Sequence, residues 1–81
     1  MTFTVEIQNP DEIKEHNHIV HIFVSPDEID QLVIDLQHLK NAKPGTSVRL
    51  FSSDWGGGEL SDTPQRNDSV ATNMLRIWRA D

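Results

Sequence analysis

Three histidines lie close together in the first quarter of the chain and are the first candidates for metal chemistry. His16, His18 and His21 are spaced His-x-His-x-x-His, with Glu12 and Glu15 nearby. Imidazole and carboxylate groups are common zinc ligands. In a strand that begins at His18, however, His18 and His21 point to opposite faces, because successive side chains alternate. We therefore expect solvated or sheet-face histidines here, with no metal and no other cofactor.

A run of three glycines follows Trp55 and raises the question of phosphate binding. A phosphate-binding loop of the Walker type needs a lysine and a serine or threonine leading into a helix. Here Gly56, Gly57 and Gly58 are followed by Glu59, whose negative charge would repel a phosphate. The glycines are more typical of a tight turn that holds Trp55 in place. The sequence leaves open whether that turn also takes part in recognition.

Acidic residues are numerous, but their pattern does not indicate catalysis. Paired carboxylates work as acid and base only inside a concave, partly dry site. The serines near the glycine run lack a nucleophile motif such as G-x-S-x-G. We therefore expect a protein that is not an enzyme, with solvated acids on the loop and on the helix described below: Asp54, Glu59, Asp62 and Asp68, then Asp27, Glu28, Asp30 and Asp35.

Length and charge narrow the function classes. Eighty-one residues are enough for one domain, residues 1–81, with a thin core that a partner or a second copy would complete. Thirteen acidic and seven basic residues give a net charge of −6, which argues against nucleic acid or an anionic membrane and favours a basic protein as partner. The chain has no cysteine, no apolar run long enough for a membrane span and no signal-like start. We expect a cytoplasmic protein.

The elements that must position these residues follow from hydrophobic periodicity. Alternation predicts strands over residues 2–8, 18–24, 47–51 and 73–79. Between the second and third strands, Ser25-Pro26-Asp27-Glu28 is a capping box that predicts the start of a helix. An apolar stripe continues that helix to Lys40, and Pro44-Gly45 ends it. The expected fold is α+β, a two-layer β-β-α-β-β domain with one helix on a four-stranded, mainly antiparallel sheet. Residues 52–72 form a long connecting loop.

One helix covers only one face of such a sheet. We expect the helix to cover Phe3, Val5, Ile7, Val20, Ile22, Val24, Val48, Leu50, Leu75 and Ile77. Alternation directs the opposite set outward: Ile19, His21, Phe23, Arg49, Phe51, Met74, Arg76 and Trp78. Aromatic residues, methionine and arginine are enriched at protein interfaces. Three interpretations stay open: the long loop covers this face with Trp55 or Leu60 as its lid, a second copy does, or a different protein does.

The stretch from Leu50 to Leu60, LFSSDWGGGEL, resembles small bacterial immunity proteins of polymorphic toxin systems, immunity protein family thirty-two among them. Members of that group are similar in length and share a strand that runs into a Trp-Gly-Gly-x-x-Leu stretch. The resemblance implies a cytoplasmic inhibitor that binds a cognate toxin and blocks it. Trp55, Gly56, Gly57 and Leu60 match the motif, whereas Asp54, Gly58 and Glu59 are not established parts of it.

The sequence therefore predicts a binding protein that neutralises a cognate, basic toxin by occlusion. Its partner-binding residues are predicted in two groups, the loop residues Asp54, Trp55, Gly56, Gly57, Glu59 and Leu60 and the sheet-face residues Arg49, Phe51 and Trp78. The alternative function is a small structural or regulatory domain that forms a homodimer through its open sheet face.

Overall fold

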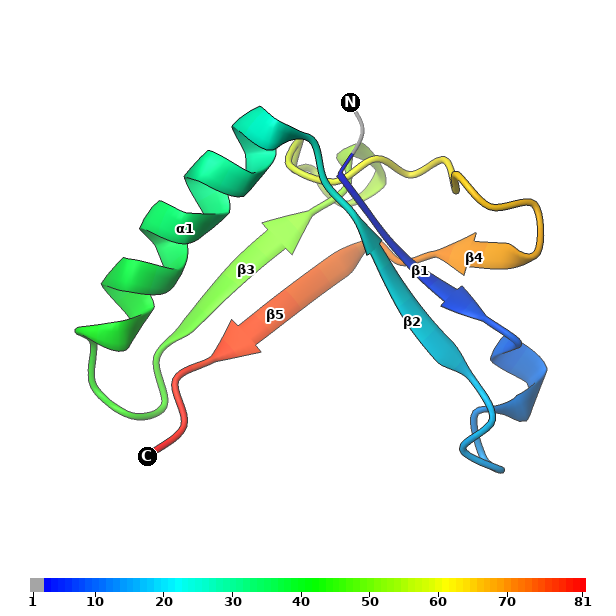
Figure 1. Cartoon of the computed structure of the whole chain (residues 1–81), viewed down its shortest axis with the longest axis horizontal. Helices are drawn as coiled ribbons and strands as arrows, with labels where there is room; N and C mark the ends of the chain where they lie inside the picture. The colour runs from blue at the N-terminus through cyan, green and yellow to red at the C-terminus, as the bar shows by residue number, and fades with distance from the viewer. Residues whose placement is uncertain (1–2) are drawn as a thin grey trace.

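The part of the chain that the structure describes folds as one α-helix and two antiparallel sheets (Figure 1). This computed structural model describes residues 3–81. In chain order the elements are β1 (Thr4–Gln8), the 3-10 helix η1 (Pro10–Glu12), β2 (Ile19–Phe23), α1 (Pro26–Lys40), β3 (Ser47–Phe51), the 3-10 helix η2 (Ser53–Trp55), β4 (Ser69–Ala71) and β5 (Met74–Trp78). The α+β class is confirmed.

The prediction of a single four-stranded sheet is wrong. The strands form a three-stranded sheet in the order β2-β1-β4 and a separate pair, β3-β5. The extra strand β4 lies inside the predicted loop 52–72 and pairs with β1. The chain then crosses to the second sheet within two residues: the Thr72 N–H donates to Val5 O (2.8 Å), and Asn73 O accepts from the Ser52 N–H (2.9 Å). Because consecutive residues bond to different sheets, β5 pairs with β3 alone.

The helix begins as its capping box predicts. The Glu28 N–H donates to Ser25 Oγ (3.4 Å), and Glu28 Oε1 accepts from the Ser25 N–H (2.8 Å). Pro26 occupies the first turn, where a missing N–H does no harm. Glu28 Oε2 also accepts from the Phe3 N–H (3.2 Å), which ties the start of α1 to the beginning of the chain.

The hydrophobic core lies where the two sheets meet. Phe3 lies just before β1 and Val5 within it, Leu50 comes from β3, and Leu60 comes from the loop that follows β3. Four partly buried residues pack around them: Val24, Leu32, Val48 and Leu75. The sheets come together where β1 begins and β3 ends, and they diverge from there (Figure 1). The core therefore occupies only one end of each sheet.

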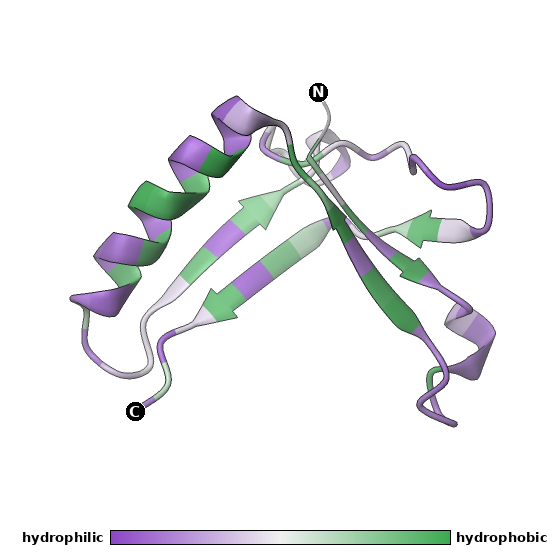
Figure 2. Cartoon of the chain, in the orientation of Figure 1, coloured by the Kyte–Doolittle hydropathy of each residue, from purple (hydrophilic) through white to green (hydrophobic). Residues whose placement is uncertain are grey.

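Beyond this junction, the apolar faces stay open to solvent. Val20 and Ile22 are 52% and 51% exposed, so the prediction that the helix covers them is wrong. The reason is that α1 packs on β3, away from β2. Figure 2 shows hydrophobic positions along both α1 and β2 outside the core.

The molecule is consequently less compact than its mass suggests. Its accessible surface is 5656 Å², compared with about 4,900 Å² for a typical folded chain of this mass. Its radius of gyration is 13.6 Å, compared with about 12 Å for a compact domain of this length. The expectation of a thin core agrees with this shape.

Candidate binding surface

Residues 52–60, which we call the Trp55 turn, form an ordered structure within the predicted loop. The helix η2 brings Trp55 back toward Ser52, whose carbonyl accepts from the N–H groups of Trp55 (3.1 Å) and Gly57 (2.9 Å). Gly56 ends η2 with φ 82°, a left-handed conformation that L side chains rarely adopt. The glycines therefore close a turn, which agrees with their interpretation from the sequence.

Ser52 anchors this turn to the start of β5. Its side chain is fully buried. Its Oγ donates to Asn73 Oδ1 (2.7 Å), and its backbone N–H donates to Asn73 O (2.9 Å). Leu60 closes the other end, because its N–H donates to Phe51 O (3.1 Å). Both ends of the Trp55 turn are thus fixed to the β3-β5 sheet.

Gly57 and Glu59 hold the middle of the turn. Gly57 lies so close to Phe51 that a Cβ at position 57 would be 2.4 Å from the Phe51 Cβ. Glu59 Oε2 accepts from the N–H groups of Gly58 (3.0 Å) and Phe51 (3.4 Å). These donors, chiefly Gly58, hold the pKa of Glu59 below its ordinary value. The turn therefore packs against β3, and the hydrogen bonds of the Glu59 carboxylate fix its position.

The predicted loop residues divide into exposed and buried groups. Asp54, Trp55, Gly56 and Glu59 are exposed, and the Trp55 side chain is 60% exposed. Leu60 is only 1% exposed and belongs to the core. In this structure Leu60 supports the turn from below, while Asp54 and Trp55 face solvent.

The outer face of the β3-β5 sheet carries the second predicted group. Antiparallel register places Trp78 opposite Ser47, Arg76 opposite Arg49 and Met74 opposite Phe51. The Arg76 guanidinium lies 3.9 Å from the centre of the Trp78 ring, and its Nε donates to Ser47 Oγ (2.9 Å). Trp78 is 55% exposed. A stacked arginine and an exposed indole thus lie side by side on this face.

Arg49 and Arg76 add an electrostatic feature to the same face. They are cross-strand partners, so their Cβ atoms lie about 5 Å apart and their like charges repel. A carboxylate or carbonyl group of a partner would relieve that repulsion. The pair forms a small positive area on a protein whose net charge is −6.

The Trp55 turn adjoins the β3-β5 sheet at the Phe51 end of β3. Trp78 lies opposite Ser47, and Ser47 lies four residues, or about 13 Å, from Phe51 along β3. Phe51 is half-buried beneath Gly57, so the turn continues the outer face at its far end. We call this area the tryptophan surface and define it by Asp54, Trp55, Arg49, Arg76 and Trp78. Phe51, Gly56, Gly57 and Glu59 support it.

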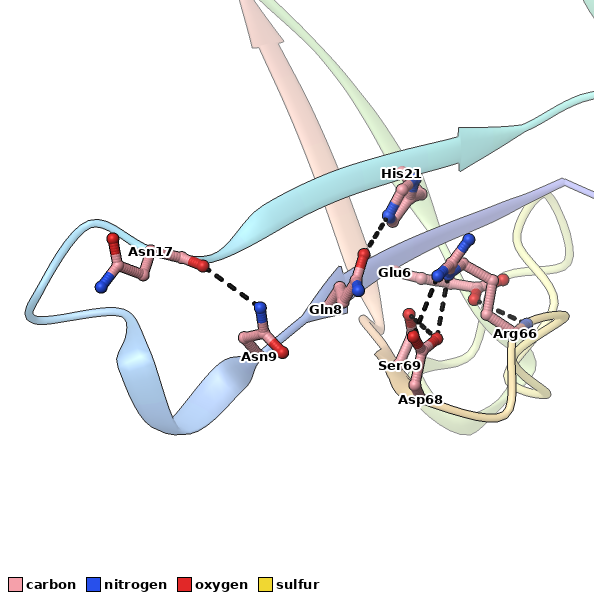
Figure 3. Close-up of polar contacts among 8 residues, drawn as sticks. All are labelled: Glu6, Gln8, Asn9, Asn17, His21, Arg66, Asp68 and Ser69. Carbon is pink, nitrogen blue, oxygen red and sulfur yellow. Dashed lines mark hydrogen bonds and ion pairs between the residues drawn. The ribbon is translucent and has the colours of Figure 1, made fainter.

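The rest of the long loop covers a different face from the one expected. Glu6, at the centre of β1, is fully buried. It accepts from the backbone N–H groups of Gln65 (2.7 Å) and Arg66 (3.1 Å), and Arg66 is in turn bonded to Asp68 (2.9 Å) (Figure 3). The loop therefore closes over the polar side of the first sheet, and Trp55 is not its lid.

Glu6 keeps its charge despite its burial. Burial raises the pKa of Glu6, but the N–H groups of Gln65 and Arg66, the Thr4 hydroxyl and the nearby His21 together hold it below the ordinary value of 4.5. The buried Glu6 and Ser52 were not among the predicted site residues. An alternating strand gives no signal that one of its polar residues will be covered by a segment sixty positions away.

The histidines take separate positions. His21 Nε2 lies 2.8 Å from Gln8 Oε1, and His16 is exposed with φ 61°. Across residues 3–81, histidine, aspartate and glutamate side chains form no cluster of three or more that could hold a metal ion. Within the same residues, α1 is too short and too polar to cross a membrane.

Comparison of the chain with models of known protein families, with curated proteins and with solved structures gives no match.

Proposed function

We propose that this chain is a non-enzymatic binding protein whose partner protein covers the tryptophan surface. The observation that supports this most strongly is the exposure of both tryptophans, Trp55 and Trp78. Tryptophan is highly buried on average in folded proteins, and tryptophan and arginine are the residues most enriched at binding hot spots.

Rigid presentation of these side chains favours binding. Trp55 stands on a turn that Ser52 fixes at one end and Leu60 at the other. Arg76 is held between Ser47 and the Trp78 ring. Side chains that are already ordered lose less conformational entropy when a partner binds, so more of the contact energy appears as affinity. The surface is prepared for a partner in this sense.

The net charge of −6 indicates what kind of partner this is. A negative protein attracts a positive one over several ångströms and speeds their encounter. We propose a basic protein, with Asp54 and Glu59 at the edge of the contact. The resemblance to bacterial immunity proteins supports a cognate toxin as that partner, neutralised because the bound chain blocks access to it.

A second candidate function is a homodimeric structural or regulatory domain. The apolar side of the β2-β1-β4 sheet supports it, because Val20, Ile22 and Val70 are all about half exposed there. In this case two copies bury these residues against each other. Sedimentation equilibrium distinguishes the two functions: a dimer that Val20→Lys dissociates, and that Trp55→Ala leaves intact, favours the second.

The binding function is tested by affinity capture from a lysate of the source organism. Wild type, Trp55→Ala and Ile13→Ala serve as baits, after circular dichroism has shown that all three fold. Ile13 is exposed and lies outside the tryptophan surface, so it is the matched control. We expect one basic protein that wild type and Ile13→Ala retain and Trp55→Ala loses. Equal retention by all three removes Trp55 from the interface.

A further inference from the structure

β2 is the last strand of the sheet β2-β1-β4, and its outer edge meets no other strand among residues 3–81. One hydrogen bond shows which backbone groups lie on that edge. The Val5 carbonyl accepts from the Thr72 N–H on the β4 side of β1 (2.8 Å), and the backbone groups of successive strand residues point to alternate edges. Glu6 therefore bonds toward β2, where its partner is His21. The N–H and C=O groups of the two residues that flank His21 consequently point outward.

These two residues, Val20 and Ile22, present four backbone groups at the edge. Within the part of the chain that the structure describes, no hydrogen bond reaches their N–H or C=O groups. Their side chains are about half exposed. They lie on the apolar face of the sheet, because the register pairs them with Ile7 and Val5. The edge therefore offers donors, acceptors and apolar side chains that repeat about every 7 Å.

β2 lacks the features that normally protect an edge strand. Protected edge strands are very short, are interrupted by bulges, or carry lysine or proline. β2 has the sequence Ile-Val-His-Ile-Phe, is hydrophobic along most of its length (Figure 2), and pairs in register with β1 at all five positions. At the other edge of the sheet, β4 is only three residues long. β2 is therefore the edge at which a further strand can be added to this sheet.

The charges at the two ends of β2 indicate what kind of segment is added. Residues 11–15, in the turn before β2, include three acidic residues and one lysine, and Asp27 is exposed at the start of α1 after β2. Antiparallel pairing of two copies would bring this turn of one copy next to the start of α1 in the other, where like charges repel. Two chains of net charge −6 also repel each other at longer range. A segment with basic residues is attracted to both ends.

We infer that the outer edge of β2 binds an extended segment of the partner protein as an added antiparallel strand. Apolar side chains of this segment lie opposite Val20 and Ile22, and its basic residues lie at both ends. Backbone hydrogen bonds supply the affinity of such an added strand, and the alternate side chains supply its specificity. Antiparallel pairing is the more stable kind per residue. This inference rests on the proposed function, because it describes the segment that the basic partner contributes.

The test uses the fluorescein-labelled peptide Lys-Lys-Val-Thr-Val-Lys-Lys, whose binding is followed by fluorescence anisotropy. Two matched peptides each carry two backbone N-methyl groups, one peptide on both valines and the other on the threonine and the lysine that follows the second valine. The two have the same charge and lack the same number of donors, but their methyl groups lie on opposite edges of the extended peptide. A fourth peptide has glutamate in place of each lysine.

The protein variants are Val20→Pro and Val20→Ala. Proline removes the outward N–H of residue 20 and leaves the bonds between β2 and β1 in place, and proline is tolerated on strand edges. Alanine keeps that N–H and only shortens the side chain, so it is the matched control. Trp55→Ala is a second control, because Trp55 belongs to the tryptophan surface. Circular dichroism checks that each variant is folded.

We expect saturable 1:1 binding of the parent peptide to wild type. N-methylation of the valines weakens binding about tenfold or more, because two hydrogen bonds are lost, whereas N-methylation of the threonine and lysine stays within about threefold. Val20→Pro binds the parent peptide about fivefold or more weakly, while Val20→Ala and Trp55→Ala stay within about threefold of wild type. The glutamate peptide binds at least about fivefold more weakly than the lysine peptide, because its charge is repelled.

Five results overturn the inference. These are no saturable binding at millimolar peptide, equal losses with the two N-methylated peptides, equal binding of the glutamate peptide, equal binding by wild type and Val20→Pro, and a dimer in sedimentation equilibrium that Val20→Pro dissociates. The last result assigns the β2 edge to a second copy of the chain. With the captured partner, loss of binding in Trp55→Ala but not in Val20→Pro removes the added strand and leaves the proposed function standing. Loss in neither variant removes both.

Discussion

Replacement of Gly57 by alanine tests whether the Trp55 turn depends on close packing against β3. A Cβ at position 57 would lie 2.4 Å from the Phe51 Cβ and 2.7 Å from the Phe51 carbonyl oxygen. Ordinary contacts of this kind are about 3.5–4.0 Å. The turn must therefore move away from β3 by more than an ångström, or Phe51 must move with its strand.

The expected cost is large compared with the stability of so small a domain. Overpacking of this kind typically costs about 1–3 kcal/mol, and a domain of this size is stable by only about 4–12 kcal/mol. Gly58→Ala is the matched control, because a Cβ there meets nothing within 4 Å. It should be neutral or stabilise by about 0.5 kcal/mol, since alanine restricts the unfolded chain. The two variants should therefore differ by about 1–3.5 kcal/mol.

Urea unfolding followed by far-ultraviolet circular dichroism measures this difference. Tryptophan fluorescence is the weaker probe, because Trp55 and Trp78 are already exposed in the folded state. We expect a lower midpoint for Gly57→Ala than for Gly58→Ala, with similar slopes. Equal midpoints refute the packing of the turn against Phe51, and with it the rigid presentation of Trp55.

The remaining predictions concern the hydrogen bonds from Gln65 and Arg66 to Glu6, and the hydrophobic core beneath the Trp55 turn. Glu6→Gln should cost about 2–3 kcal/mol at pH 7, because it weakens the bonds from Gln65 and Arg66 to a buried carboxylate. The folded pKa of Glu6 lies below its ordinary value of 4.5, so its contribution is complete above pH 4.5 and is lost as the pH falls through the folded pKa. The urea midpoints of wild type and Glu6→Gln should therefore converge in acid. A difference that stays constant with pH would show that the charged Glu6 carboxylate does not stabilise the fold. Leu60→Ala should cost about 3 kcal/mol in the same assay, because Leu60 is 1% exposed in the core. A loss below about 1 kcal/mol would show that Leu60 does not belong to the core.

Local signals in the sequence predicted the helix well. Ser25, Pro26 and Glu28 form the capping box that the structure contains, and Gly45 takes a positive φ of 90° after the helix. These features depend on residues within one turn of each other. The β3 strand, with its ends at Ser47 and Phe51, was predicted for the same reason.

The division into two sheets could not be predicted in this way. It depends on pairing between Ser69–Ala71 and β1, and on the clamp that Glu6 forms with Gln65 and Arg66. Ser69-Val70-Ala71 is too short to give a clear alternating pattern. Burial of Glu6 is also opposite to the usual behaviour of glutamate, so only the folded chain reveals it.

For the candidate surface, residue types in the sequence singled out the side chains of interest, but the sequence did not show which of them would be buried. Trp55 and Trp78 were predicted as partner contacts from their types, and both are exposed. Leu60 was predicted together with them but lies in the core, because hydrophobicity alone does not tell a contact residue from a supporting one. The open edge of β2 depends on the order of the strands in the sheet, which local sequence patterns do not determine.

The role of Trp55 as a partner contact is tested by calorimetric titration of the captured partner into wild type, Trp55→Ala and Ile13→Ala. We expect one partner per chain. We also expect the loss of Trp55 to weaken binding by about 2 kcal/mol or more, roughly thirtyfold, while Ile13→Ala binds like wild type. Equal affinity of wild type and a folded Trp55→Ala would contradict the account, because Trp55 would then be exposed without serving as a contact.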